Sequence, residues 1–185
     1  MMRSFLLALL LLACPLGGAQ ERRAAEAVLA GRVTRVIDGD TLDVLLASGR
    51  IRVRLHGIDA PERDQAGGDE SRRWLQQRVQ DRQVQLEPVS QDQYERMVAI
   101  VHLDDANVNL ELLRQGQAWA YRAYLRRADR IFCDIEAAAR VGGQGLWGAA
   151  PAHAPWEHRR TRDRGPFTDF SRQSAGDCWR QRRKP

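Results

Sequence analysis

The sequence predicts an α+β domain built on a small five-stranded β-barrel with about three helices. Five short β-like segments are separated by turn signals, and a helical pattern lies between the third and the fourth of them. Two further helical patterns follow the fifth segment. With 185 residues and a mass of 21.0 kDa, the chain is long enough for one domain with a hydrophobic core. Because 43% of the residues are hydrophobic and no segment repeats, disordered, coiled-coil and repeat architectures are excluded.

The second and third strands, expected over 41–47 and 50–55, form a hairpin around the turn signal Ser48-Gly49. With that turn, the apolar residues pair as Leu42 with Leu55, Val44 with Val53, and Leu46 with Ile51. All six side chains then lie on one face, while Asp43 is expected opposite Arg54 on the other.

The remaining elements follow from the same periodicities. They are a strand over 28–37, a helix over 69–81, strands over 83–88 and 98–103, a helix from a cap at Asn109 to Gly116, and a helix over 130–140. On the last helix, Ile131, Ile135 and Ala138 are expected to face the core. Five strands with a helix between the third and the fourth match the OB-fold layout, whose barrel face suits oligonucleotides. We place this domain at residues 28–150.

Residues 1–19 are expected to be a signal peptide. Arg3 gives a positively charged start, an apolar run follows, and small residues come after it. The apolar run is too short to span a bilayer as a helix. We therefore expect a secreted or periplasmic protein. The alternative is a lipoprotein, attached to a membrane through a lipid on Cys14.

The export signal also determines how the two remaining cysteines are interpreted. Cys133 and Cys178 would lie in an oxidising compartment, where a structural disulfide is the expected state. Neither cysteine has a histidine or cysteine at zinc-like spacing. Their bond would tie the C-terminal part of the chain to the helix over 130–140.

Positive charge is concentrated at the C-terminal end. The chain carries a net charge of +5, and most of its basic residues are arginines. Residues 151–185 form a basic extension, in which basic side chains far outnumber acidic ones from position 159 onward. Such an extension suits a polyanion, either a nucleic acid or an anionic membrane surface. A solvated tail without a partner is the alternative.

Four acidic residues are expected to converge at the open end of the hairpin: Asp38, Asp40, Asp59 and Glu62. Carboxylates gathered this closely repel one another unless a cation neutralises them. Oxygen-only ligands favour a hard ion, calcium or magnesium, over zinc. Taken alone, each acidic segment is typical of an ordinary turn, so the metal site depends on their convergence.

These segments resemble the staphylococcal nuclease (thermonuclease) family. The matching segments are Val36-Ile37-Asp38-Gly39-Asp40-Thr41, Arg52 to Glu62, Asp92-Gln93-Tyr94-Glu95-Arg96, Asn109-Leu110-Glu111-Leu112-Leu113, Gly145-Leu146-Trp147, and Ala154 to Arg160. The resemblance covers about residues 28–160, and the order of the segments makes it specific. It implies that Asp40, Thr41 and Asp59 bind a calcium ion, Thr41 through its backbone carbonyl, with Asp38 nearby.

The resemblance also implies roles in catalysis and substrate binding. Glu62 corresponds to the base for the attacking water, and Arg54 and Arg96 to the pair that grips the scissile phosphate. Tyr94 and Tyr124 correspond to aromatic residues near the nucleotide. Tyr121 is an alternative to Tyr124, and Glu95 stands where the family usually has glycine. If that position has a positive φ, glutamate is strained there.

The function expected from the sequence is an exported, metal-dependent endonuclease that cleaves DNA and RNA, with calcium favoured over magnesium as its cofactor. Phosphodiester hydrolysis needs an activated water, a metal ion and cations around the phosphate, and the predicted residues supply this set. Single strands are the preferred substrate and a monomer is expected. The alternative is a non-catalytic OB-fold module that binds single-stranded nucleic acid.

Overall fold

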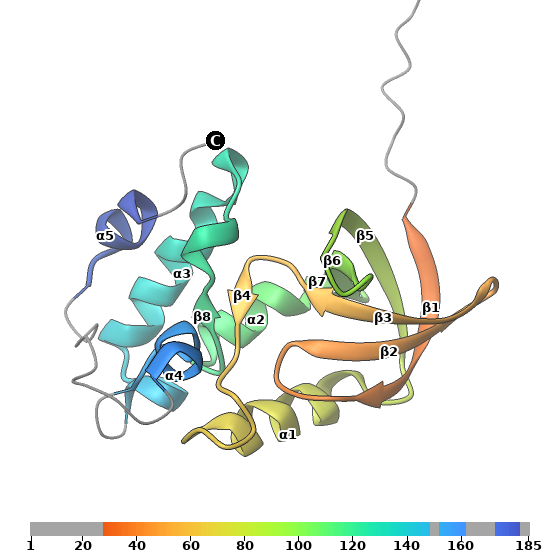
Figure 1. Ribbon diagram of the computed structural model, residues 1–185, viewed down its shortest axis with the longest axis horizontal. Helices are drawn as coiled ribbons and strands as arrows, with labels where there is room; N and C mark the ends of the chain where they lie inside the picture. The colour runs from red at the N-terminus through yellow and green to blue at the C-terminus, as the bar shows by residue number, and fades with distance from the viewer. Residues whose placement is uncertain (1–27, 149–151, 162–172, 182–185) are drawn as a thin grey trace, which may run out of the picture.

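A computed structural model describes residues 28–148, 152–161 and 173–181 of the chain (Figure 1). The expected signal peptide, residues 1–19, lies outside the described residues. Among the helices that are described, none is long and apolar enough to cross a membrane.

The core of the fold is a closed five-stranded barrel. Its strands are β1 Leu29–Val36, β2 Thr41–Leu46, β3 Gly49–Leu55, β5 Gln83–Gln91 and β6 Met97–Leu103. They pair antiparallel in the order β3-β2-β1-β5-β6, and a parallel pairing of β3 with β6 closes the barrel. Alternate side chains fill its interior, with Val33, Val44, Val53, Leu86 and Val101 fully buried. The α+β OB-fold prediction is confirmed.

Helices cover one end and one side of the barrel (Figure 1). They are α1 Gly68–Val79, α2 Val108–Arg114, α3 Arg130–Val141, α4 Pro155–Thr161 and α5 Ala175–Arg180. The described residues thus hold five α-helices rather than about three, because the basic extension contributes two short ones. A two-stranded sheet of β4 Ile58–Asp59 and β8 Trp119–Ala120 lies between the barrel and α3, and a short strand β7 Ala106–Asn107 leads into α2.

The predicted disulfide is present and joins two of these helices. Cys133 of α3 and Cys178 of α5 are linked through an S–S bond of 2.02 Å. Both cysteines are buried against the core, so the bond holds the described part of the extension on the domain.

The hairpin register predicted from the sequence is wrong by two residues. Leu46 pairs with Gly49, so Ala47 and Ser48 form the turn, and Gly49 takes a φ of 125° directly after it. A shift of two keeps each side chain on its face, which is why the apolar pattern did not detect it. The partner of Asp43 is consequently Arg52, whose Nε donates to Asp43 Oδ1 at 2.8 Å.

Two helix details also differ from the prediction. The cap of α2 is Asn107, whose Oδ1 accepts the Leu110 N–H at 3.0 Å. Asn109 is fully buried and instead binds backbone groups, with Oδ1 accepting the Val101 N–H at 3.0 Å. On α3 the buried face includes Phe132 and Cys133, whereas Ile131 is exposed. The helix is rotated because the disulfide and the ring of Phe132 take the core positions.

Candidate active site

A buried arginine stands at the centre of the site, between two carboxylates. Arg54 Nη1 lies 2.9 Å from Asp40 Oδ2, and Arg54 Nη2 lies 2.9 Å from Asp59 Oδ1. The side chains of Arg54 and Asp59 are only 12% and 1% exposed. The guanidinium also donates to the Ile58 carbonyl at 3.0 Å, so the backbone fixes its orientation. This geometry confirms that Arg54 and the two aspartates come together.

Local turn chemistry positions Asp40. Asp38 Oδ1 accepts the Asp40 N–H at 3.0 Å, which closes the turn through Gly39. A Cβ at Gly39 would lie 2.6 Å from the Ala60 Cβ, so only glycine allows this close approach. Asp40 Oδ2 then accepts the Ala60 N–H at 2.8 Å, and Oδ1 accepts the Thr41 hydroxyl at 3.0 Å.

The electrostatics of this centre reflect buried like charges. Burial, and then the charge of Asp40, raises the pKa of Asp38 to about 7. Burial also raises the pKa of Asp59 to about 6, with a further increase from Asp40, even though Arg54 opposes it. Burial is thus the main reason why both carboxylates hold a proton more tightly than in water, and Asp40 adds to it.

A second arginine reaches the centre from the C-terminal extension. Arg159 of α4 donates through Nη1 and Nη2 to the two oxygens of Asp59, at 3.2 and 2.7 Å. Its Nη1 also lies 2.7 Å from Glu62 Oε1. Burial disfavours the charged form, but the hydrogen bonds and charge of Asp59 outweigh it and raise the pKa of Arg159. Glu62 is thereby linked to the same centre as Asp59.

Sequence reasoning did not assign a role to Arg159. The run from Ala154 to Arg160 is part of the family resemblance, and this is the signal that points to it. Composition alone groups Arg159 with the other basic residues of the extension, so its place in the site is visible only in the folded chain.

Tyr121 rather than Tyr124 lies against the arginines. The Arg54 Cζ is 5.9 Å from the centroid of the Tyr121 ring, and Arg159 Nη2 is 3.4 Å from its hydroxyl. Tyr124 is 57% exposed and touches the centre through Tyr121, with ring centroids 4.7 Å apart. The two tyrosines form one aromatic edge of the site.

Arg96 is held by residues of its own turn. Its Nε lies 2.7 Å from Asp92 Oδ2, and its Cζ is 5.3 Å from the centroid of the Tyr94 ring. All three residues belong to the turn between β5 and β6, where Glu95 has a φ of 61°. Among the described residues, the hydrogen-bond and ion-pair partners of Arg96 are thus local and do not include Arg54 or Glu62. Position 95 does have a positive φ, so the condition under which glutamate is strained there is met.

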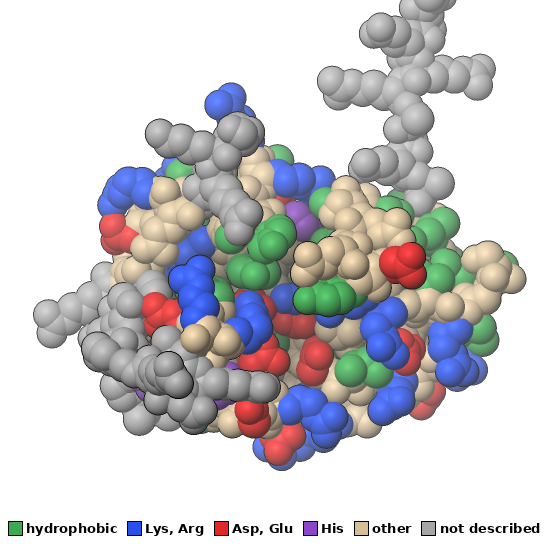
Figure 2. Space-filling model, in the orientation of Figure 1, with side chains coloured by type: hydrophobic (Ala, Val, Ile, Leu, Met, Phe, Trp, Pro, Cys, Tyr) green, Lys and Arg blue, Asp and Glu red, His purple; other side chains and the backbone are tan. Residues whose placement is uncertain are grey.

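An open groove connects this turn to the acidic loop. It has a volume of about 650 Å³, and its lining includes Asp38, Thr41, Tyr94 and Arg96. In Figure 2 acidic and basic side chains lie next to one another across the middle of the visible face, where β4 passes in Figure 1. The lining of the groove itself carries both signs of charge, with Asp38 and Asp43 beside Arg52 and Arg96.

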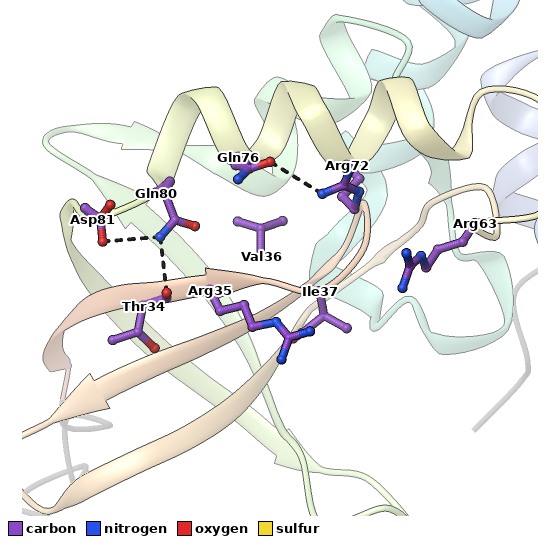
Figure 3. Close-up of a pocket in the computed structure, with 9 residues that line it drawn as sticks. All are labelled: Thr34, Arg35, Val36, Ile37, Arg63, Arg72, Gln76, Gln80 and Asp81. Atoms are coloured by element: carbon purple, nitrogen blue, oxygen red, sulfur yellow. Dashed lines mark hydrogen bonds between the residues drawn. The ribbon is translucent and has the colours of Figure 1, made fainter.

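A second groove, of about 500 Å³, lies between β1 and α1 (Figure 3). It presents three arginines, Arg35, Arg63 and Arg72, and its floor includes Ile37. Arg35 and Ile37 line both grooves, which makes the two adjacent.

The site offers few protein ligands for a metal ion. Across residues 28–148, 152–161 and 173–181, no three His, Cys, Asp or Glu side chains form a metal-binding group. The convergence of all four acids is therefore looser than expected, with Asp40 and Asp59 on Arg54 and Glu62 joined to them through Arg159. Two carboxylates and a backbone carbonyl remain as candidate donors.

Comparison with known proteins agrees with this geometry. The family model described as "Staphylococcal nuclease homologue" matches residues 52–149. The chain is 41% identical to "Protein ParB" of Escherichia coli, over 74% of this chain and 82% of that protein. It is 39% identical to an "Uncharacterized endonuclease" of Haemophilus influenzae, over 70% and 72% of the two chains. It is 37% identical to "Micrococcal nuclease" of Shigella flexneri, over 70% and 80%. The chain therefore belongs to the family of staphylococcal nuclease homologues.

Proposed function

We propose that the protein is an exported, calcium-dependent endonuclease that hydrolyses phosphodiester bonds of DNA and RNA, single strands above all. Membership of the family supports nuclease activity in general. The observation that supports this mechanism is the buried Arg54 between Asp40 and Asp59, with Glu62 joined to the same centre. Residues 1–19, with their signal-peptide pattern, are the reason to propose export.

Asp40, Asp59 and the backbone carbonyl of Thr41 are the groups that would hold the calcium ion. They form an oxygen-only donor set, and the raised pKa of Asp59, about 6, reflects burial and the charge of Asp40. Such a set fits a hard divalent cation, with water and substrate oxygens completing the coordination. When bound, calcium supplies polarisation of a phosphoryl oxygen and neutralises developing charge.

The side chains of the site perform the proton transfer and the charge stabilisation. Glu62 accepts a proton from the attacking water, whose oxygen bonds to phosphorus while one ester P–O bond breaks. Arg54 donates paired N–H groups to the phosphoryl oxygens, on which negative charge accumulates. Arg96 supplies the second guanidinium from the groove, once the phosphate replaces Asp92 as its anionic partner.

Two exposed tyrosines near the site can stack on the bases of the substrate. Tyr94 is 70% exposed beside Arg96, and Tyr124 is 57% exposed beside Tyr121. Stacking of bases on such rings is tolerant of sequence and requires unpaired bases, which is why we propose single strands as the preferred substrate.

The test compares cleavage and binding in one variant. Glu62→Gln keeps the size of the side chain but cannot accept the proton, so cleavage of heat-denatured DNA should fall by about 10²- to 10⁴-fold. Binding of a short single strand, measured by fluorescence anisotropy, should persist. Glu70→Gln, an exposed carboxylate on α1, is the matched control and should cleave like the wild type.

Two results would contradict the proposal. Cleavage by Glu62→Gln at the wild-type rate would remove Glu62 from the mechanism. A wild-type protein that binds single strands but cleaves none under any metal condition would support the non-catalytic OB-fold module instead.

A further inference from the structure

We propose that Arg159 is an internal cation that occupies Asp59 and Glu62 and must be displaced before calcium binds. This inference rests on the proposed calcium site at Asp40, Thr41 and Asp59. It assigns to the C-terminal extension a direct role in the reaction centre, as the element that controls access of the metal ion.

Arg159 uses the groups that metal binding and proton transfer need. Asp59 Oδ1 accepts from both Arg54 and Arg159, at 2.9 and 3.2 Å, and Asp59 Oδ2 accepts from Arg159 at 2.7 Å. Glu62 Oε1 is bound to the same guanidinium at 2.7 Å. One side chain therefore engages a candidate metal ligand through both oxygens and the candidate base through one.

Arg159 and a divalent ion cannot share Oδ2 of Asp59, the oxygen that Arg54 leaves free. Both are positively charged, and at contact distance their repulsion is strong where water is excluded. Asp59 is 1% exposed, so solvent does not screen the two charges there. The same guanidinium occupies Glu62 Oε1, so this oxygen cannot accept a proton from water while Arg159 is in place. Calcium binding and activation of Glu62 thus both require Arg159 to leave.

The helix that carries Arg159 is anchored, so the side chain is the part that moves. The Trp156 ring stacks on Tyr121, with centroids 6.0 Å apart and planes inclined by 8°. His158 Nε2 lies 3.2 Å from Asp64 Oδ1 on the other side of the helix. Arg159 itself is 38% exposed and needs only rotation about its side-chain bonds to reach solvent. After release it stays beside the centre.

Substrate would favour this release. A phosphate that enters the site offers the guanidinium a new anionic partner, and paired N–H groups suit phosphate oxygens. Nucleic acid that draws Arg159 away from Asp59 makes the carboxylate available to calcium. By linkage, calcium then strengthens nucleic-acid binding by the same factor.

The experiment is a calcium titration without nucleic acid, by isothermal calorimetry on the chelator-stripped full chain. If Arg159 occupies Asp59 in about 90% of molecules, its removal raises the apparent calcium affinity about tenfold. Arg159→Gln should show this gain. Arg160→Gln removes the same charge from the next position, which is exposed and forms no hydrogen bond or ion pair with the described residues, and should bind calcium like the wild type.

Two further variants separate the possible explanations. Arg159→Lys keeps the positive charge but loses the forked pairing, so its calcium affinity should lie between those of the wild type and Arg159→Gln. If Arg159→Gln fails to fold, as thermal unfolding followed by circular dichroism would show, Arg159→Lys tests the proposal in its place. Asp40→Asn, which removes a proposed ligand without touching Arg159, should abolish binding.

The outcomes distinguish the displacement proposal from the metal site itself. Equal or weaker calcium binding by Arg159→Gln and Arg159→Lys, with binding lost in Asp40→Asn, would overturn the role of Arg159 alone. Absence of calcium binding in every variant, or unchanged binding in Asp40→Asn, would overturn this inference together with the calcium site.

Discussion

The ionised Asp38 carboxylate destabilises the folded state, so replacing Asp38 should raise the free energy of unfolding of the metal-free protein. Burial and the charge of Asp40 raise its pKa from 3.8 to about 7. The folded state therefore binds this proton more tightly than the unfolded chain does. The stability contributed by the protonated group is fully present below about pH 4 and is lost as the pH rises towards 7.

The size of the effect follows from the two pKa values. Each pKa unit corresponds to about 1.4 kcal/mol, so the ionised Asp38 costs up to about 4 kcal/mol at about pH 8. At about pH 5 the cost is only about 1.6 kcal/mol, because only the interval above 3.8 contributes. The Asp38→Asn variant has no such cost and keeps a side-chain oxygen to accept the Asp40 N–H. We expect the Asp38→Asn variant to have a free energy of unfolding about 2 to 4 kcal/mol higher than that of the wild type at about pH 8.

The assay is guanidinium unfolding in the presence of chelator, at about pH 5 and about pH 8. Asp104→Asn is the matched control, since Asp104 is an exposed carboxylate at a φ of 54°, a conformation that asparagine tolerates. The control should differ little from the wild type at either pH. A loss of stability in Asp38→Asn at about pH 8, or a gain in stability that does not depend on pH, would show that the ionised Asp38 carboxylate does not destabilise the fold.

Three further predictions concern stability. Replacing Cys133 and Cys178 by alanine should lower the free energy of unfolding in urea by about 2–4 kcal/mol, because the disulfide links residues 45 positions apart. Adding a reductant should destabilise the wild type but not this variant. Glu95→Gly should raise the free energy of unfolding by about 1 kcal/mol by relieving a φ of 61°, whereas Glu95→Ala, measured in parallel, should give no such gain. Glu136→Gln should lower the free energy of unfolding by about 3–5 kcal/mol in the same assay, because this buried carboxylate neutralises two arginines that would then be left without its charge. A decrease below about 1 kcal/mol would contradict this explanation.

The barrel could be predicted because its strands and helices follow simple periodicities. Val33 and Val53 lie between polar neighbours, and such alternation fixes which face of a strand is buried. It does not fix pairing, since a shift of two residues preserves every face. The turn at Ala47 and Ser48, with Gly49 taking the positive φ, decided the register.

Parts of the site were predictable for a different reason. Asp40 lies in a turn that Asp38 closes two residues earlier, and the family resemblance locates Asp59. Arg159 lies 97 residues beyond Glu62 and reaches it only because α4 packs back on the domain. A contact of that separation leaves no local pattern. Arg96 was expected beside the phosphate from the family resemblance; it lines the groove while paired with Asp92 of its own turn, and its role stays a prediction.

The most direct test of the central claim is digestion of heat-denatured DNA by chelator-stripped protein, with calcium and magnesium added back separately. We expect no cleavage in the stripped sample, full recovery with calcium, and no recovery in Asp59→Asn. Cleavage that continues after complete removal of both ions would contradict the assignment of Asp40, Thr41 and Asp59 as metal ligands.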